Sequence, residues 1–277
     1  MTWDFVGVGI DDQADQVVDV RHAQTARVYD YLLGGKNNYG ADQVAAQQAL
    51  GVVPHLRTSA RENRAFLHRA VRFAAGAGVD QFLDVGTGIP TEPNLHQIAQ
   101  GVNPAARVVY VDHDPLVLVH ARALLTGSPE GRTAFVDADL RSPQAILSSA
   151  AVGTTLDLSR PVGLSLVAVL HFVPDSDDPA SIVADLVAAA PKGSLLVLSH
   201  GTGDFAPERT RLGVEAYRKA GITVQVRSRD EVAALVPAGL EILDPGIVPV
   251  HRWRPDTDPD QYKDEEIGIY GLVGRKL

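Results

Sequence analysis

The sequence contains no cysteine, one methionine and no long apolar run. The absence of cysteine excludes disulfides, thiol nucleophiles, zinc fingers and cysteine-held iron–sulfur clusters. A membrane helix needs about 18 consecutive apolar residues, whereas runs such as LVAVL at 166–170 have the length of a buried strand. The stretch MTWDFVGVGIDDQADQ also lacks the basic and apolar regions of a signal peptide. We therefore expect a cytoplasmic protein without a membrane segment.

Positive charge is also scarce, with 25 Lys and Arg against 34 Asp and Glu and a net charge of -9. A protein that grips phosphate backbones should be basic, so no nucleic-acid partner is expected. The histidines show no metal-ligand spacing such as H-E-x-x-H, and no metal site is predicted. With 277 residues, of which 45% are hydrophobic and 21% charged, the chain has a globular composition with enough apolar surface for a core.

The first part of the chain predicts an arm followed by helices. Residues 1–24 are polar and acidic and predict a loose N-terminal arm. Residues 25–78 have helical periodicity and predict a helical cover segment. The turn Gly34-Gly35-Lys36-Asn37-Asn38 interrupts it, because glycine and asparagine tolerate positive φ.

From residue 80 the pattern changes to short apolar runs that alternate with helical stretches. One strand–helix unit takes about 30 residues, and such alternation predicts a parallel sheet with helices on both faces. The predicted strands are 81–85, 107–112, 133–139, 163–171 and 194–200. The helices between them are predicted at 93–100, 115–125 and 179–190.

The tail predicts a different ending. A helix at 207–221 and a capping box from Ser228 to Glu231 are followed by predicted strands at 240–248 and 267–276. No helical pattern separates these two strands, so they should pair antiparallel. We predict a doubly wound α/β fold with a mostly parallel seven-stranded sheet and an antiparallel last strand. Residues 79–277 would form this domain, in one compact unit with the helical cover at 25–78.

The loop after the first strand has the features of a nucleotide-class site. Gly86 and Gly88 in DVGTGIP allow a ligand to approach the backbone closely, and Thr91 is a candidate cap for the next helix. The motif is not a dinucleotide fingerprint, because Thr91 stands where the third glycine belongs. Gly35-Lys36 is not a P-loop either, since Asp30 and Asn37 occupy two of its required positions.

Three acids follow successive predicted strands, where α/β folds bind ligands. Asp112 can accept hydrogen bonds from a ribose diol, and Asp139 can accept one from an adenine amine. Together with Asp84 they form an electronegative rim, which repels a pyrophosphate and attracts a cationic adenosyl ligand. Charge therefore favours S-adenosylmethionine over NAD.

FLDVGTGIP, VVYVDHDP, VDADLR, VAVLHFVPD and YGLVGRK resemble the ordered motifs of class I S-adenosylmethionine-dependent methyltransferases. ARVYDYLLGGKNNYGAD, RENRAFLHRAVR and FLDVGTGIPT more closely resemble a bacterial methyltransferase family first catalogued as a domain of unknown function. This resemblance covers residues 22–277 and implies a Rossmann-like methyltransferase fold with S-adenosylmethionine as cofactor. It defines no acceptor.

The resemblance also implies roles for single residues. Asp84, Gly86, Thr87 and Gly88 would hold the methionine part of the cofactor, Asp112 the ribose, and His113, Asp139 and Leu140 the adenine, while Leu170 and His171 would lie near the sulfonium.

The helical cover and His171 are the candidates for acceptor chemistry. Tyr29, Tyr31, Lys36 and Asn38 could shape a pocket for a small-molecule methyl acceptor, although helix packing and a plain turn explain them equally well. Arg64 could pair with the cofactor's carboxylate, or it could belong to a solvated basic face. His171 could act as a general base, or simply bond to backbone.

Several functions remain open at this point. The leading hypothesis is an S-adenosylmethionine-dependent methyltransferase with a small-molecule acceptor. The alternatives are a non-catalytic cofactor-binding or partner-binding protein on the same fold, and an NAD-dependent oxidoreductase, which Thr91 and the acidic rim disfavour. The sequence does not define the oligomeric state.

Overall fold

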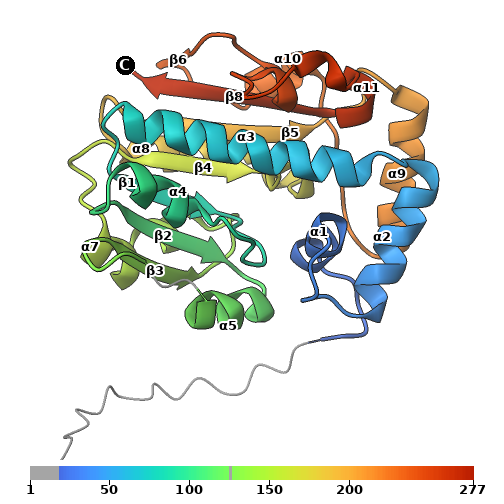
Figure 1. Ribbon diagram of the computed structural model, residues 1–277, viewed down its shortest axis with the longest axis horizontal. Helices are drawn as coiled ribbons and strands as arrows, with labels where there is room; N and C mark the ends of the chain where they lie inside the picture. Colours follow the sequence, from blue (N-terminus) through green and yellow to red (C-terminus); the bar gives the residue numbers. More distant parts are fainter. Residues whose placement is uncertain (1–18, 125–126) are drawn as a thin grey trace, which may run out of the picture.

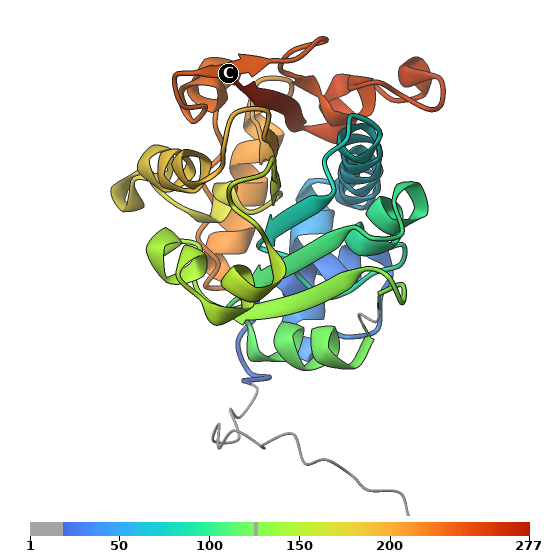
Figure 2. The same ribbon diagram turned by 90° about the vertical axis from the view of Figure 1, so that its left-hand side faces the viewer.

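A twisted sheet of eight strands runs through the molecule, with helices on both faces (Figures 1 and 2). The computed structural model describes residues 19–124 and 127–277, so residues 1–18 of the predicted arm lie outside the described residues. The strands are β1 (Gln81–Val85), β2 (Arg107–Asp112), β3 (Arg132–Asp137), β4 (Gly163–Val167), β5 (Leu195–Gly201), β6 (Leu240–Ile242), β7 (Val248–Pro249) and β8 (Ile269–Lys276).

The strand order is β3-β2-β1-β4-β5-β8-β6, with β7 paired beside β8. Strands β1 to β5 are parallel, and β8 runs antiparallel to β5, β6 and β7. The predicted mostly parallel sheet with an antiparallel last strand is confirmed. The predicted strand 240–248 is instead two strands, because Pro245 lacks a backbone donor and the Gly246 amide turns back to the Leu243 carbonyl at 2.8 Å.

Helices cover the two faces in separate groups. Side chains alternate along each strand, so Phe82 packs toward α3, α4 and α5 while Leu83 packs toward α6, α7, α8 and α10. The helices are α1 (Thr25–Leu33), α2 (Gly40–Val52), α3 (Leu56–Gly76), α4 (Leu95–Val102), α5 (Pro115–Leu124), α6 (Pro143–Leu147), α7 (Ala150–Thr155), α8 (Pro179–Ala189), α9 (Pro207–Lys219), α10 (Arg229–Ala234) and α11 (Asp264–Ile267). Short 3-10 helices are η1 (Leu170–Phe172), η2 (Asp175–Asp177), η3 (Val250–Arg252) and η4 (Pro259–Gln261).

Helices α1, α2 and α9 form a third group beyond the ends toward which the parallel strands point (Figure 1). Val28 and Leu32 of α1, Ala45 and Ala46 of α2, and Ile222 after α9 share one apolar cluster. Two distant parts of the chain thus build one wall opposite the strand ends. The third helix of the predicted cover, α3, lies instead on a face of the sheet. The division into an arm, a cover and a larger domain stays a prediction.

A buried ion cluster fixes α1 against this end of the sheet. The Arg27 Nε lies 3.8 Å from Asp42 Oδ1 in α2 and 3.5 Å from Asp114 Oδ2 in the β2–α5 loop. All three side chains are buried. Burying a charged group is costly unless opposite charges lie beside it, so the cluster joins the helical wall to the loop after β2.

Among the described residues, no helix is long and apolar enough to cross a membrane, and no group of three or more potential metal ligands is found.

Candidate functional site

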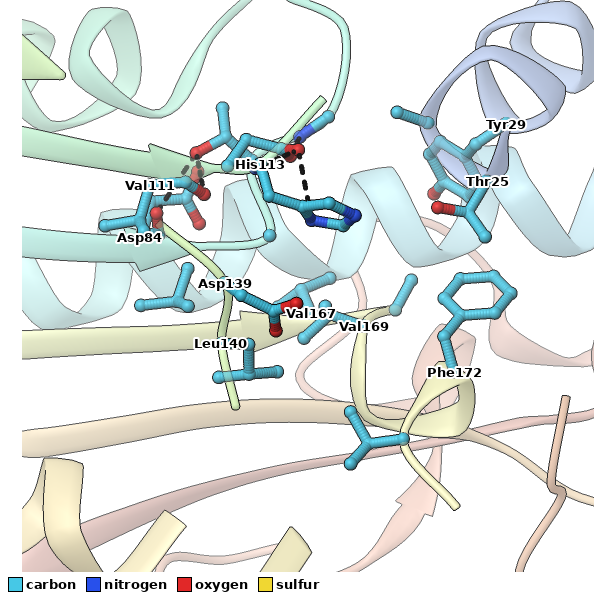
Figure 3. Close-up of a pocket in the computed structure, with 18 of the residues that line it drawn as sticks. Thr25, Tyr29, Asp84, Val111, His113, Asp139, Leu140, Val167, Val169 and Phe172 are labelled. Atoms are coloured by element: carbon cyan, nitrogen blue, oxygen red, sulfur yellow. Dashed lines mark hydrogen bonds and ion pairs between the residues drawn. The ribbon is translucent and has the colours of Figure 1, made fainter. Parts of the chain in front are cut away.

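Two adjoining cavities lie between the strand ends and the helical wall. The first, called here the strand-end cavity, is bordered by the loops after β1 to β4 and by α1 and α3. Its open volume is about 1000 Å³ with the mouth included, which matches the size of cofactor sites. Thr25 and Tyr29 of α1, with Phe172, face the strand ends across this space (Figure 3). The sequence-predicted residues that line it are Tyr29, Arg64, Asp84, Gly86, Thr87, Gly88, Asp112, His113, Asp139 and Leu140.

The turn after β1 requires glycine. Gly86 has φ +76°, and a Cβ placed there would lie 2.4 Å from Val169 Cγ2. Gly88 has φ +68°. Such dihedrals favour glycine, so the backbone passes close to the β4 loop and leaves the cavity open. Asn94, rather than Thr91, caps α4, and its Oδ1 accepts a hydrogen bond from the Thr91 amide at 3.1 Å.

Asp112 at the end of β2 is held by backbone donors. Its Oδ2 accepts a hydrogen bond from the Gly88 amide at 2.8 Å. Its Oδ1 accepts hydrogen bonds from the His113 and Asp114 amides at 2.8 and 3.0 Å. Burial raises the pKa of Asp112, and these donors oppose the shift. The carboxylate is therefore fixed in orientation, with one Oδ2 lone pair left for a ligand.

Asp84, at the end of β1, is a buried acid in the strand-end cavity. Burial raises its pKa from 3.8 to about 6, the nearby Asp112 raises it as well, and the charge of Arg64 opposes the shift. A carboxyl in this setting is poised to lose its proton when a cation arrives. The site therefore favours positively charged ligands.

Asp139 is engaged with its neighbour Arg141. The Arg141 Nη2 donates to Asp139 Oδ2 at 2.6 Å, and its Nε donates to Oδ1 at 3.0 Å. These hydrogen bonds lower the pKa of Asp139. The acid stays charged at the rim, and an adenine amine would share it with the guanidinium.

Two of the residues predicted to bind the cofactor, Arg64 and Leu170, have their main contacts elsewhere in the protein. Arg64 donates through Nη2 to the carbonyls of Thr91 and Pro93, so it anchors the β1–α4 loop, and its Nε is buried without a partner in the described part of the chain. Leu170 is fully buried in the core and does not line the strand-end cavity.

The second cavity, called here the helix cavity, is enclosed by α1, the start of α3, η1, α9 and α11, and its lining is mainly apolar. Thr25, Tyr29, Ala168 and Phe172 line both cavities, so these four residues form a shared wall. The helix cavity was not predicted from the sequence. A signal was present in α9 and at its N-cap Ala206, where small and aromatic residues recur at helical spacing and line the cavity: Ala206, Thr210, Gly213 and Tyr217.

His171 lies in the helix cavity, beyond the end of β4 at Val167. Burial lowers the pKa of its imidazole to about 3, and the nearby His200 and Arg227 add to the effect. Its Nδ1 accepts a hydrogen bond from the Gly201 amide at 3.4 Å. The ring proton then sits on Nε2. In this environment the imidazole is a neutral hydrogen-bond donor rather than an effective general base at neutral pH.

A chain of hydrogen bonds supports the shared wall. Tyr29 Oη donates to the Ala60 carbonyl at 3.0 Å and accepts from Asn63 Nδ2 at 3.0 Å. Asn63 Oδ1 accepts from Ser199 Oγ at 2.6 Å, and Ser199 Oγ accepts from the Ala168 amide at 2.9 Å. Ala168 has φ +56°, a left-handed conformation that this bond helps to hold.

The other predicted acceptor residues, Tyr31, Lys36 and Asn38, line neither cavity. Tyr31 lies within α1, and the turn that holds Lys36 and Asn38 is explained by Asp30, whose Oδ2 accepts hydrogen bonds from Asn38 Nδ2 at 2.7 Å and the Asn37 amide at 2.9 Å. A Cβ on Gly35 would lie 2.0 Å from the same carboxylate. The glycine–asparagine motif therefore closes a turn over Asp30.

Comparisons with known proteins agree with this architecture. A search of curated proteins finds no match to the chain. The crystal structure of a DUF574 family protein from Streptomyces avermitilis has 46% identity and a TM-score of 0.91, and the match covers 94% of this chain and 100% of the other. A Thermobifida fusca protein described as a candidate methyltransferase has 40% identity and a TM-score of 0.85, and the match covers 94% and 97%.

The family model that matches describes S-adenosyl methyltransferases and spans residues 11–277. Since this match takes in nearly the whole chain, the protein belongs to the S-adenosyl methyltransferase family, and S-adenosylmethionine is its cofactor.

Proposed function

We propose that this methyltransferase binds S-adenosylmethionine in the strand-end cavity and methylates a small molecule that enters the helix cavity. The observation that supports this assignment is the wall that both cavities share, formed by Thr25, Tyr29, Ala168 and Phe172. A cofactor bound in one cavity and a methyl acceptor bound in the other would come into contact at these four residues. Positioning of this kind supplies much of the rate enhancement in a direct group transfer.

The residues of the strand-end cavity fit the cofactor on physical grounds. The raised pKa of Asp84 and the buried Asp112 suit a ligand that carries positive charge. The glycine turn is a cradle that a Cβ at Gly86 would close. We assign Asp84 and the turn to the methionine part, Asp112 to the ribose, and His113, Asp139 and Leu140 to the adenine.

When bound, S-adenosylmethionine supplies an electrophilic methyl: the acceptor's lone pair bonds to its carbon as the carbon–sulfur bond breaks, the electron pair stays on sulfur, and the acceptor's proton leaves to solvent. The chain's own residues orient the reactants and exclude water. Phe172 and Tyr29 line both cavities where they adjoin, and His171 can donate a hydrogen bond within the helix cavity. Where the attacking atom of the acceptor already has a free lone pair, the transfer needs no residue that acts as a strong base.

Calorimetric titration with S-adenosylmethionine, S-adenosylhomocysteine and NAD, followed by a screen of labelled methyl transfer to small molecules, tests the proposal. We expect both sulfur compounds to bind, NAD not to bind, and at least one small acceptor to take up label. Cofactor binding without transfer to any acceptor would instead favour a non-catalytic binding protein. A cytoplasmic location stays a prediction.

A further inference from the structure

We propose that the helix cavity takes an acceptor with an apolar body and a carboxylate, and that Arg209 binds this carboxylate. The inference rests on the proposed function, because it presumes that the helix cavity is the acceptor site. Three features of the lining support it: its apolar walls, an arginine without a counter-ion, and a few polar groups that no other residue uses.

The walls of the helix cavity are built for an apolar body. Val28 and Leu32 come from α1, Leu56 from α3, and Val214 and Tyr217 from α9. Burying apolar area against such walls contributes roughly 25 cal/mol per Å². A strongly hydrated acceptor, such as a free sugar, would lose its water shell here and gain few hydrogen bonds in return.

Arg209 breaks this apolar lining. It is part-buried on α9, and it forms no hydrogen bond, ion pair or ring contact with any residue in 19–124 or 127–277. The exposed Arg211 on the same helix, in contrast, lies 3.4 Å from Glu208 and 3.9 Å from Glu215. A guanidinium left unpaired beside an apolar cavity is suited to a planar anion, and a carboxylate matches its fork geometry.

Two acids also border the helix cavity, and neither pairs with Arg209. Glu266 lies 3.5 Å from His55 Nδ1, and its Oε2 accepts a hydrogen bond from the Lys263 amide at 2.8 Å. Glu265 is exposed to solvent. Water screens the charge of Glu265 from the cavity, and Glu266 is already paired with His55 and the Lys263 amide. Arg209 is therefore the charged group of the lining that is left for a ligand.

Two neutral groups complete the polar part of the lining. Burial raises the pKa of Tyr217 to about 12, so its phenol stays protonated, and its Oη has no partner among the described residues. His171 has a similarly unused Nε2. Both can donate a hydrogen bond to a neutral oxygen or nitrogen of the acceptor, while Arg209 binds its carboxylate.

The experiment compares three probes with the same ring system: 1-naphthoate, 1-naphthamide and 1-naphthylmethylamine. Their affinities are measured calorimetrically at pH 7.5 for the wild type and for Arg209→Gln, with Arg211→Gln as the matched control on the same helix. We expect 1-naphthoate to bind about tenfold more tightly than the amide, since an ion pair replaces a neutral hydrogen bond. The amine should bind most weakly. Arg209→Gln should abolish the preference, and Arg211→Gln should keep it.

Any of four results would overturn the inference. These are equal affinities for the acid and the amide, a preference for the amine, no binding of any probe, and an unchanged preference for the acid in Arg209→Gln. S-adenosylhomocysteine is titrated into the same samples. Its failure to bind would overturn the proposed function and leave the acid preference as a separate result. Normal binding of S-adenosylhomocysteine without an acid preference would overturn this inference alone.

Discussion

The Gly88 amide donates a hydrogen bond to Asp112 Oδ2 at 2.8 Å, which joins the glycine turn after β1 to the end of β2. Two further amides bind the other oxygen of the same carboxylate. The side chain that we assign to the ribose therefore also shapes the turn that we assign to the methionine part. Changing Asp112 should disturb both.

Asp112→Ala should weaken S-adenosylmethionine binding by roughly 1–3 kcal/mol, or about 5- to 150-fold, because charge-assisted hydrogen bonds are lost. Calorimetric titration measures the change. Asp137, the exposed register partner of Asp112 on β3, provides the control. Asp137→Ala should leave the dissociation constant unchanged, and an unchanged constant for Asp112→Ala would contradict the ribose assignment.

Gly86→Ala should lower cofactor affinity more than about tenfold, because the new Cβ would overlap Val169 and the residue keeps φ +76°. Gly78→Ala separates the strain of a positive φ from the overlap with a neighbouring side chain. Gly78 has φ +93°, but no atom lies within 4 Å of the place that the new methyl group would take. This substitution should lower the melting temperature without affecting binding. Equal affinities for the two variants would show that the close approach to Val169 is unimportant.

Cofactor affinity should rise with pH through about 6. The carboxyl of Asp84 holds its proton up to that pH, and a cationic ligand prefers the charged carboxylate. At pH 5 about one molecule in ten would carry the charge, so affinity should be about tenfold lower than at pH 7.5. Titrations at the two pH values measure this difference, and Asp84→Asn should bind weakly and with little pH dependence.

The raised pKa of Asp84 should also make the folding stability of the ligand-free protein depend on pH. This pKa is raised in the folded state, so the native protein holds more protons than the unfolded chain between pH 3.8 and about 6. The contribution of Asp84 to folding stability therefore falls as pH rises through this window. Urea unfolding of the wild type and Asp84→Asn should show this slope in the wild type alone, and identical slopes would contradict the raised pKa.

His171→Asn should retain most of the methyl transfer rate. The pH profiles of the wild type and the variant should have the same shape between pH 6 and 8. The reason is that the pKa of His171 is lowered to about 3, so the ring stays neutral throughout this range. Initial rates with any acceptor from the screen provide the measurement. A basic limb near pH 6.5 that disappears in His171→Asn would restore the general-base role expected from the sequence.

Arg27→Met should destabilise the protein by about 3–5 kcal/mol, because it leaves two buried carboxylates without their cation. Urea unfolding measures the loss. Arg21→Met is the control, since the Arg21 side chain is 85% exposed beside Asp19 and such surface pairs contribute about 1 kcal/mol or less. Similar losses in both variants would argue against the buried cluster as the link between α1 and the β2–α5 loop.

The sequence was informative where chemistry follows local pattern. Asp84 and Asp112 could be placed at one edge of the sheet because each ends an apolar run, and parallel strands end together. The same reasoning extended the fourth strand to His171, although β4 ends at Val167 and the chain turns at Ala168, which adopts positive φ. Hydrogen bonding to Ser199, 31 residues away, holds that turn and leaves no local pattern.

The acceptor side could not be predicted in the same way. The turn residues Lys36 and Asn38 drew attention because their motif is unusual, yet the motif serves Asp30. The helix cavity instead combines α1, which ends at Leu33, with α9, which begins only at Pro207. Arg209 gave no signal in the sequence, because its position as an arginine at the edge of an apolar cavity, unpaired within the described part of the molecule, follows only from the folded chain.

A crystal structure of the protein with S-adenosylhomocysteine would show whether the cofactor lies where we propose. We expect the adenosyl group in the strand-end cavity against Asp112, with the sulfur at the wall formed by Thr25, Tyr29, Ala168 and Phe172 and open to the helix cavity. Ligand density in the helix cavity instead, or a sulfur directed away from that wall, would contradict it.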